Sequence, residues 1–127
     1  MGIAAADATD VWAVGTATYC DNEGGRCTSS PTAFRWNGSQ WSSSSPPVNA
    51  GSFAGAGAIN ASDVWAVGGG AQNWNGSAWS VVPTAGVSGA SNALLGVAGS
   101  SAHDVWAVGY SQATSGVVHT LVEHFTG

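Results

Sequence analysis

The sequence predicts an all-β protein, and two repeated phrases support this prediction. Asp-Val-Trp-Ala-Val-Gly occurs at Asp10–Gly15, Asp63–Gly68 and Asp104–Gly109, and Trp-Asn-Gly-Ser-x-Trp-Ser occurs at Trp36–Ser42 and Trp74–Ser80. Helical solenoid repeats also have units of about 40 residues. However, Val-Trp-Ala-Val is a short β-branched and aromatic run between Asp and Gly, and no helical spacing of apolar residues continues along the chain. The repeated segments are therefore predicted to be strands.

Each repeat is predicted to be a meander of antiparallel strands. A strand rich in glycine and alanine comes first, followed by a polar turn and then the Val-Trp-Ala-Val strand. The opening strands are Gly2–Ala4, Gly55–Gly57 and Gly96–Ala98, and the turns are Asp7–Thr9, Asn60–Ser62 and Ser101–His103. The third strands are Thr32–Trp36, Ala71–Trp74 and Thr120–Phe125, and the fourth strands are Gln40–Ser42 and Ala78–Val82. Asn37-Gly38 and Asn75-Gly76 favour type I′ hairpin turns between the third and fourth strands.

Four short strands in a unit of about 40 residues are typical of a β-propeller blade. Small residues in the opening strands suit the crowded axis of a propeller, and a continuously apolar second strand suits burial between neighbouring blades. We predict one domain over residues 1–127, with blades at about 1–50, 51–90 and 91–127.

The third predicted blade lacks its outer strand, because the sequence stops at Phe125-Thr126-Gly127. A ring of three blades is too small to close, since propellers have about four to eight. We therefore expect completion by a longer chain or by oligomerisation, either as a dimer with six blades or as a filament.

The two phrases together resemble the tryptophan-rich propeller-type repeats of large, often secreted or surface-attached bacterial proteins. The resemblance covers residues 2–127 and implies a non-enzymatic scaffold. Related propellers with a tryptophan hairpin include sugar-binding lectins, but this chain lacks the Arg and Glu in each blade that the fucose-binding members use. The resemblance therefore implies a fold and leaves the ligand open.

Composition excludes several classes of partner. The chain has a formal charge of −5 and only two Lys or Arg residues, so it offers no basic surface for nucleic acid or anionic lipid. No apolar run reaches the roughly 18 residues of a membrane-spanning helix, so membrane insertion is not expected. The 44% of hydrophobic residues and seven tryptophans indicate a folded chain, not a disordered one.

Cys20 and Cys27 enclose a short polar segment, and a disulfide between them is favoured over two free thiols because no further zinc ligands lie near them. A disulfide favours an oxidising setting, so we expect a secreted or cell-surface location. The segment between the second and third strands is longest in this first repeat, and loops on a rigid scaffold often carry recognition. The candidate ligand-binding residues are Tyr19, Asp21, Asn22, Glu23, Arg26 and Tyr110.

The repeated aspartates and tryptophans are given a structural role. Asp10, Asp63 and Asp104 are expected to accept backbone N–H groups in turns. The tryptophans are expected to pack between blades, and they are Trp12, Trp36, Trp41, Trp65, Trp74, Trp79 and Trp106. His119 and Glu123 fall on one face of their strand and His124 on the other, which is poor geometry for a metal site. No cofactor or metal is predicted.

No catalytic motif is present, so an enzyme is not expected. The sequence leaves two functions open. The first is an extracellular module that binds carbohydrate or a surface polymer through long loops on one face. The alternative is a structural protein that assembles into rings or filaments.

Overall fold

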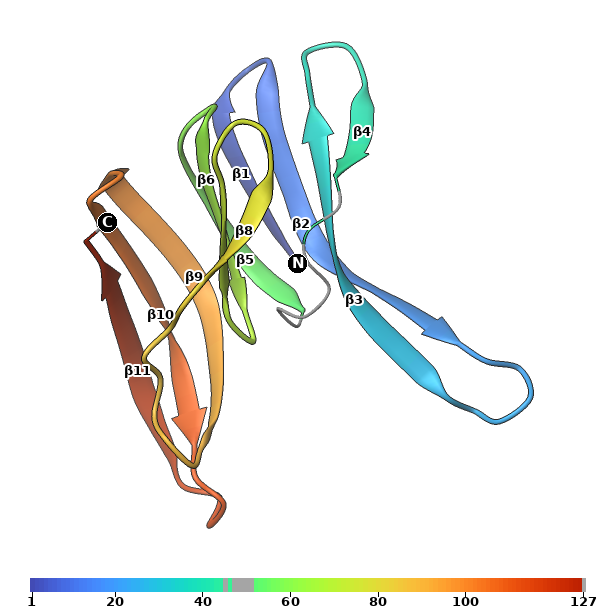
Figure 1. Ribbon diagram of the computed structural model, residues 1–127, viewed down its shortest axis with the longest axis vertical. Coiled ribbons are helices and arrows are strands. Elements are labelled where there is room, and N and C mark those ends of the chain that lie inside the picture. Colours follow the sequence, from blue (N-terminus) through green and yellow to red (C-terminus); the bar gives the residue numbers. More distant parts are fainter. Residues whose placement is uncertain (45, 47–51, 127) are drawn as a thin grey trace.

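The computed structural model describes residues 1–44, 46 and 52–126. These residues form three antiparallel sheets that lie side by side (Figure 1). The first sheet contains β1 (Gly2–Asp7), β2 (Asp10–Cys20), β3 (Cys27–Trp36) and β4 (Trp41–Ser44). The central sheet contains β5 (Phe53–Asn60), β6 (Asp63–Gly68), β7 (Ala71–Trp74) and β8 (Trp79–Val82). The third sheet contains β9 (Ser91–Ser101), β10 (Asp104–Gln112) and β11 (Val118–Phe125).

The all-β prediction is confirmed, and strands that follow one another in sequence are neighbours in each sheet. The first two sheets have four strands, whereas the third has three within the described part of the chain. The predicted boundary at residues 50–51 lies outside the described residues.

The opening strands of the three sheets pack closely against one another. A Cβ atom added to Gly55 of β5 would lie 2.4 Å from the carbonyl oxygen of Leu95 in β9, and one added to Gly57 would lie 2.5 Å from that of Val97. No side chain fits at such distances, because the obstructing atoms belong to the backbone. Glycine in the opening strand of the central sheet therefore permits the close approach of the third sheet.

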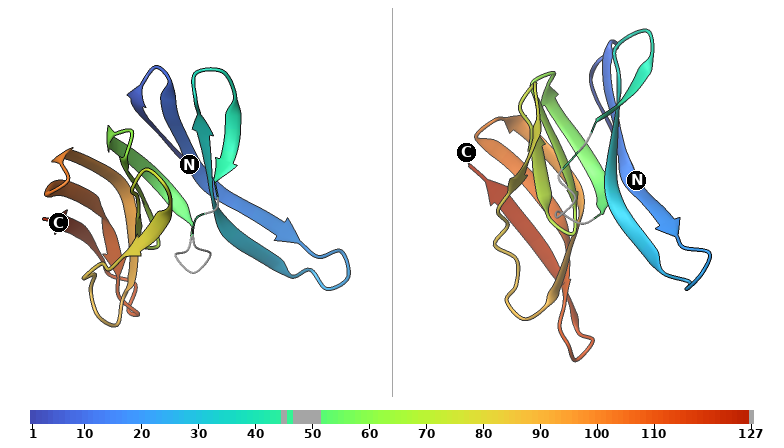
Figure 2. Two further views of the ribbon diagram at one scale, coloured as in Figure 1. Left: turned by 45° about the horizontal axis from the view of Figure 1, so that its top comes forward. Right: turned by 45° about the vertical axis from the view of Figure 1, so that its right-hand side comes forward.

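Strand β6 is buried on both faces because the central sheet is packed between the other two (Figure 2). Val64 and Ala66 belong to the core layer shared with the first sheet, and Trp65 and Val67 belong to the layer shared with the third sheet. Successive side chains of β6 point to opposite faces of the sheet, so this one strand contributes to both core layers. The equivalent strands β2 and β10 belong to the first and third sheets, and each is buried mainly on the face toward the central sheet.

Two local predictions need correction. The β3–β4 turn has positive φ only at Gly38, and Asn37 instead accepts the backbone N–H groups of Ser39 and Gln40 through its side chain. The turn therefore is not type I′, which requires positive φ at both central residues. Secondly, the long insertion of the first repeat is mostly strand, since β2 and β3 remain paired as far as Cys20 and Cys27. This hairpin extends away from the three sheets (Figure 1).

Candidate functional site

An aspartate at the start of the second strand of each sheet anchors a side chain from the third strand. In the first sheet, Arg35 donates to both carboxylate oxygens of Asp10, with Nε to Oδ1 at 2.8 Å and Nη2 to Oδ2 at 3.1 Å. Asp10 is buried, and its hydrogen bonds raise the pKa of Arg35 above its usual value. Paired hydrogen bonds of this kind fix the orientation of a guanidinium group.

The other two sheets repeat this arrangement with different partners. Asp63 accepts the Nδ2 group of Asn73 at 2.7 Å, and Asp104 lies 2.9 Å from Nε2 of His124. Asp63 also accepts the indole N–H of Trp65 at 3.0 Å. The aspartates thus hold the side chain that lies opposite the repeated tryptophan.

The predicted role of these aspartates as acceptors of turn N–H groups is wrong. The residue three positions earlier takes that role. Asp7 accepts the backbone N–H of Thr9 at 2.7 Å, and Asn60 accepts that of Ser62 at 2.8 Å. A hydrogen bond from the Thr9 hydroxyl, followed by that from its backbone N–H, lowers the pKa of Asp7.

The first and central sheets are joined by one tryptophan inserted against two others. Trp12 is fully buried, and its ring lies 4.9 Å from that of Trp74 and 5.2 Å from that of Trp79. We call Trp74 and Trp79 the inner acceptor pair. Arg35 lies over Trp12 at 5.4 Å and over Trp74 at 5.8 Å, and it adds a cation–π contact across the interface.

A second pair with the same geometry lies on the outer face of the first sheet. Trp36 and Trp41 occupy the positions of Trp74 and Trp79 in their sheet, and we call them the outer acceptor pair. Their rings are 5.8 Å apart at 49°, whereas those of the inner acceptor pair are 5.9 Å apart at 52°. Trp41 is 48% exposed, whereas Trp79 is 7% exposed. The outer acceptor pair therefore has the same arrangement as the inner one without a covering tryptophan among the described residues.

The outer face of the third sheet carries the complementary feature. Trp106 corresponds to Trp12 in the repeat, and it is 48% exposed, as is Val108. His124 stacks on the Trp106 ring at 3.9 Å and occupies the position that Arg35 has beside Trp12. The prediction that the tryptophans are core residues thus holds for Trp12, Trp65 and the inner acceptor pair but does not hold for Trp41 and Trp106.

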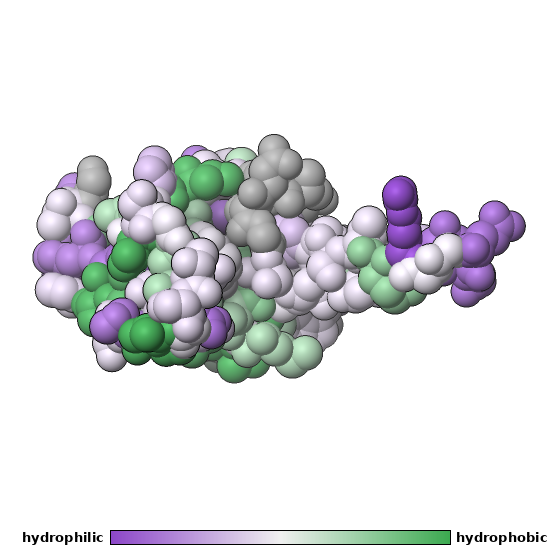
Figure 3. Space-filling model, turned by 90° about the horizontal axis from the view of Figure 1, so that it is seen from below, coloured by the Kyte–Doolittle hydropathy of each residue, from purple (hydrophilic) through white to green (hydrophobic). Residues whose placement is uncertain are grey.

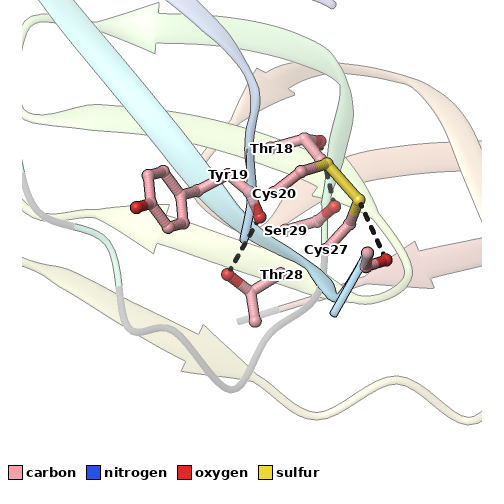
Figure 4. Close-up of a disulfide and its surroundings, with 7 residues drawn as sticks. Thr18, Tyr19, Cys20, Cys27, Thr28 and Ser29 are labelled. Atoms are coloured by element: carbon pink, nitrogen blue, oxygen red, sulfur yellow. Dashed lines mark hydrogen bonds between the residues drawn. A yellow bond between two sulfur atoms is a disulfide. The ribbon is translucent and has the colours of Figure 1, made fainter. Parts of the chain in front are cut away.

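The candidate ligand residues of the first repeat lie on the projecting β2–β3 hairpin, which we call the arm. Its disulfide joins Cys20 and Cys27 and confirms the predicted pairing (Figure 4). The Tyr19 ring points away from this disulfide and is 76% exposed. The four polar candidates are all exposed in the turn beyond it, and they are Asp21, Asn22, Glu23 and Arg26. Figure 3 shows the hydrophilic tip of the arm far from the body of the molecule.

Tyr110, the remaining candidate, is not brought together with the arm. It lies on β10 in the third sheet, and the central sheet separates the two (Figure 1). His119, Glu123 and His124 also do not converge. Glu123 is buried and accepts the backbone N–H of Gly86 at 2.6 Å. In the described part of the chain, no group of three potential metal ligands comes together.

A pocket lies between the central and third sheets, where sequence reasoning placed no site. Its volume is about 700 Å³. Its walls include Trp65 and Asn73 from the central sheet and His124 and Phe125 from the third. Its lining includes Asn60, Ser62 and Ala102 from the short turns. These turns lie at the end of the sheets opposite the arm (Figure 1).

No protein-family model, curated protein or solved structure matches the chain. The disulfide is typical of an oxidising or extracellular environment. Across the described ranges, no helix is long and apolar enough to cross a membrane.

Proposed function

We propose that the chain is a non-enzymatic assembly module of β-propeller type, whose outer sheet faces bind further copies of the same chain head to tail. One observation carries the proposal. The outer acceptor pair has the ring spacing and tilt of the inner pair, and an exposed tryptophan equivalent to Trp12 stands on the opposite face of the molecule. Each free face therefore matches one half of an interface that already exists inside the chain.

The partner of the outer acceptor pair is Trp106 of a second copy. In the internal interface the inserted tryptophan is accompanied by a valine, since Trp12 and Val14 are both buried against the central sheet. Trp106 and Val108 repeat this pair on the exposed face. Burying such side chains contributes about 1.5–3 kcal/mol each, so covering both free faces gives a strong driving force for association.

The two faces differ from one another, so the contact is heterologous. Repetition of a heterologous contact either closes a ring or extends a filament. A closed dimer has six sheets, which lies within the range of propellers. Longer chains of copies form a filament when the rotation between copies does not close. The disulfide of the arm supports a secreted or cell-surface location for such an assembly.

Two variants test this proposal when they are used together. Trp106→Glu disables one face and Trp41→Glu disables the other, and each variant alone is expected to remain a monomer of 12.5 kDa. An equimolar mixture retains one intact pair of faces, so light scattering should show a heterodimer of twice that mass. Tyr19→Glu places the same charge on the exposed arm and serves as the matched control, with assembly equal to that of the wild type.

A mixture that remains monomeric contradicts the head-to-tail arrangement, provided that circular dichroism shows both variants to be folded. Self-association of either variant alone contradicts it as well, because that result requires contact between identical faces.

A second candidate function is supported by the arm. Tyr19 presents an exposed ring on a hairpin held by a disulfide, and the adjoining turn carries polar side chains. This combination of a flat aromatic face and hydrogen-bonding groups suits a neutral carbohydrate polymer. A glycan array comparing the wild type with Tyr19→Ala tests this function. Signals that Tyr19→Ala loses support it, and equal signals for both proteins, or none for either, contradict it.

A further inference from the structure

Three asparagines stand at short turns of the first and central sheets, and each begins the tripeptide Asn-x-Ser. A tripeptide of this kind, with any residue except proline in the middle, is the acceptor sequence for nitrogen-linked glycosylation. All three turns lie at the end of the sheets opposite the arm (Figure 1). The tripeptides are Asn37-Gly38-Ser39, Asn60-Ala61-Ser62 and Asn75-Gly76-Ser77.

The turns hold the three asparagine side chains in the same way. In each, Oδ1 of the asparagine accepts the backbone N–H of the serine two residues later. Because Oδ1 and Nδ2 are attached to the same planar carbon, a hydrogen bond that ties Oδ1 to the turn directs Nδ2 away from it. The asparagines and serines are all exposed, so Nδ2 is the group that each side chain presents to solvent. The bonds are 2.9 Å from Ser39 to Asn37, 2.8 Å from Ser62 to Asn60 and 2.9 Å from Ser77 to Asn75.

The turns do not require serine at the third position of the tripeptide. The serines donate through their backbone N–H groups, which almost any residue could supply. In the equivalent turn of the third sheet, His103 donates the same kind of bond to Ser101. Within the described part of the chain, neither the serine hydroxyls nor the Nδ2 groups of these tripeptides make a hydrogen bond. A sugar attached at Nδ2 would therefore break no hydrogen bond of the fold.

We propose that Asn37, Asn60 and Asn75 are acceptors for nitrogen-linked glycosylation, with the sugar supplied by a glycosyl diphosphate donor. Nδ2 forms a bond to the anomeric carbon of the sugar, while the bond from this carbon to the phosphate oxygen of the donor breaks. The diphosphate leaves with the electron pair, and a proton of Nδ2 passes to a base of the transferase. The disulfide of the arm supports this proposal, because acceptor sequences of this kind lie in surface loops of secreted proteins.

Peptide mass spectrometry of the protein isolated from its native host tests the proposal. Each of the three tripeptides is expected to carry a glycan mass, and an amidase that cleaves the glycosyl–asparagine bond should leave aspartate in place of the asparagine. The measurement uses digested protein, so it does not depend on whether copies of the chain assemble. Unmodified masses at all three asparagines overturn the proposal, as do sugars attached only to serine or threonine hydroxyls.

Matched variants expressed in the same host test the role of the turns. Ser39→Ala and Ser77→Ala remove the acceptor sequence but keep the backbone N–H that holds the turn, so each should lose the sugar of its own tripeptide alone and keep its urea midpoint. Asp7 accepts the backbone N–H of Thr9 at 2.7 Å in the turn equivalent to that of Asn60. Asp7→Asn converts Asp-Ala-Thr into an acceptor tripeptide, and it should add a fourth glycosylated position. The proposal is overturned if a sugar persists after the serine is replaced, or if position 7 of Asp7→Asn stays unmodified.

Discussion

Replacing Trp12 by alanine should cost far more stability than the same change at Trp106, although both residues occupy the same position in the repeat. Trp12 is fully buried between the inner acceptor pair, whereas Trp106 is 48% exposed and stacks on one face only. A fully buried aromatic side chain covers about 150–250 Å², which at about 25 cal/mol per Å² corresponds to roughly 4–6 kcal/mol. Measured Trp→Ala losses in cores are about 3–5 kcal/mol. About half the area is buried at Trp106, so we expect a loss of about 2 kcal/mol or less.

Urea unfolding monitored by circular dichroism measures both losses, at a dilution where light scattering shows monomers of 12.5 kDa. A loss of the expected size removes much of the stability of a small domain. Trp12→Phe therefore provides a second measurement for the case in which Trp12→Ala does not fold, and its loss should lie between those of the wild type and the alanine variant. Equal losses of unfolding free energy for Trp12→Ala and Trp106→Ala would refute the reasoning. The interface between the first and central sheets would then stabilise the fold no more than the exposed face of the third sheet does.

Three further predictions concern single features of the fold. Reducing the disulfide should accelerate hydrogen exchange only in the arm. It should lower the free energy of unfolding by at most about 2–3 kcal/mol, through the chain entropy of the unfolded state. Faster exchange throughout the three sheets would contradict a separate arm. Gly55→Ala should lower the free energy of unfolding by about 1–3 kcal/mol in denaturant titrations, because its Cβ would lie 2.4 Å from a backbone oxygen. Gly24→Ala should leave it unchanged, since no atom lies within 4 Å of the added Cβ. Similar values for both variants would disprove the close approach. Hydrogen bonds from the Ser100 hydroxyl, and then from His124, lower the pKa of Asp104. The ionised carboxylate therefore contributes to the free energy of unfolding at neutral pH, and this contribution declines below a pH of about 4. Urea midpoints of the wild type and Asp104→Asn should therefore converge on acidification, and a constant difference would exclude this titration.

The repeated phrases were sufficient to predict the strands and their order. Val-Trp-Ala-Val is apolar at every position, and this property suits a strand that is buried on both faces, as β6 is. The short spacing between Cys20 and Cys27 also predicted the disulfide correctly. These features depend on residues that lie close together in the sequence, so periodicity and spacing reveal them.

Contacts between distant parts of the chain were harder to predict. The partner of each repeated aspartate is the third-strand residue opposite the tryptophan, and that residue is Arg35, Asn73 or His124. Because this position varies while the aspartate does not, the repeat itself contains no sign of the pairing. The exposure of Trp106 was also hidden, since the same phrase is buried or exposed according to which sheet lies beside it.

Sedimentation equilibrium of the wild-type chain over a range of micromolar concentrations tests the central claim most directly. Head-to-tail contact between Trp106 and the outer acceptor pair predicts a mass above the 12.5 kDa of one chain, rising with concentration to twice that value for a closed ring or further for a filament. A folded species that keeps the mass of a single chain at every concentration would contradict the account.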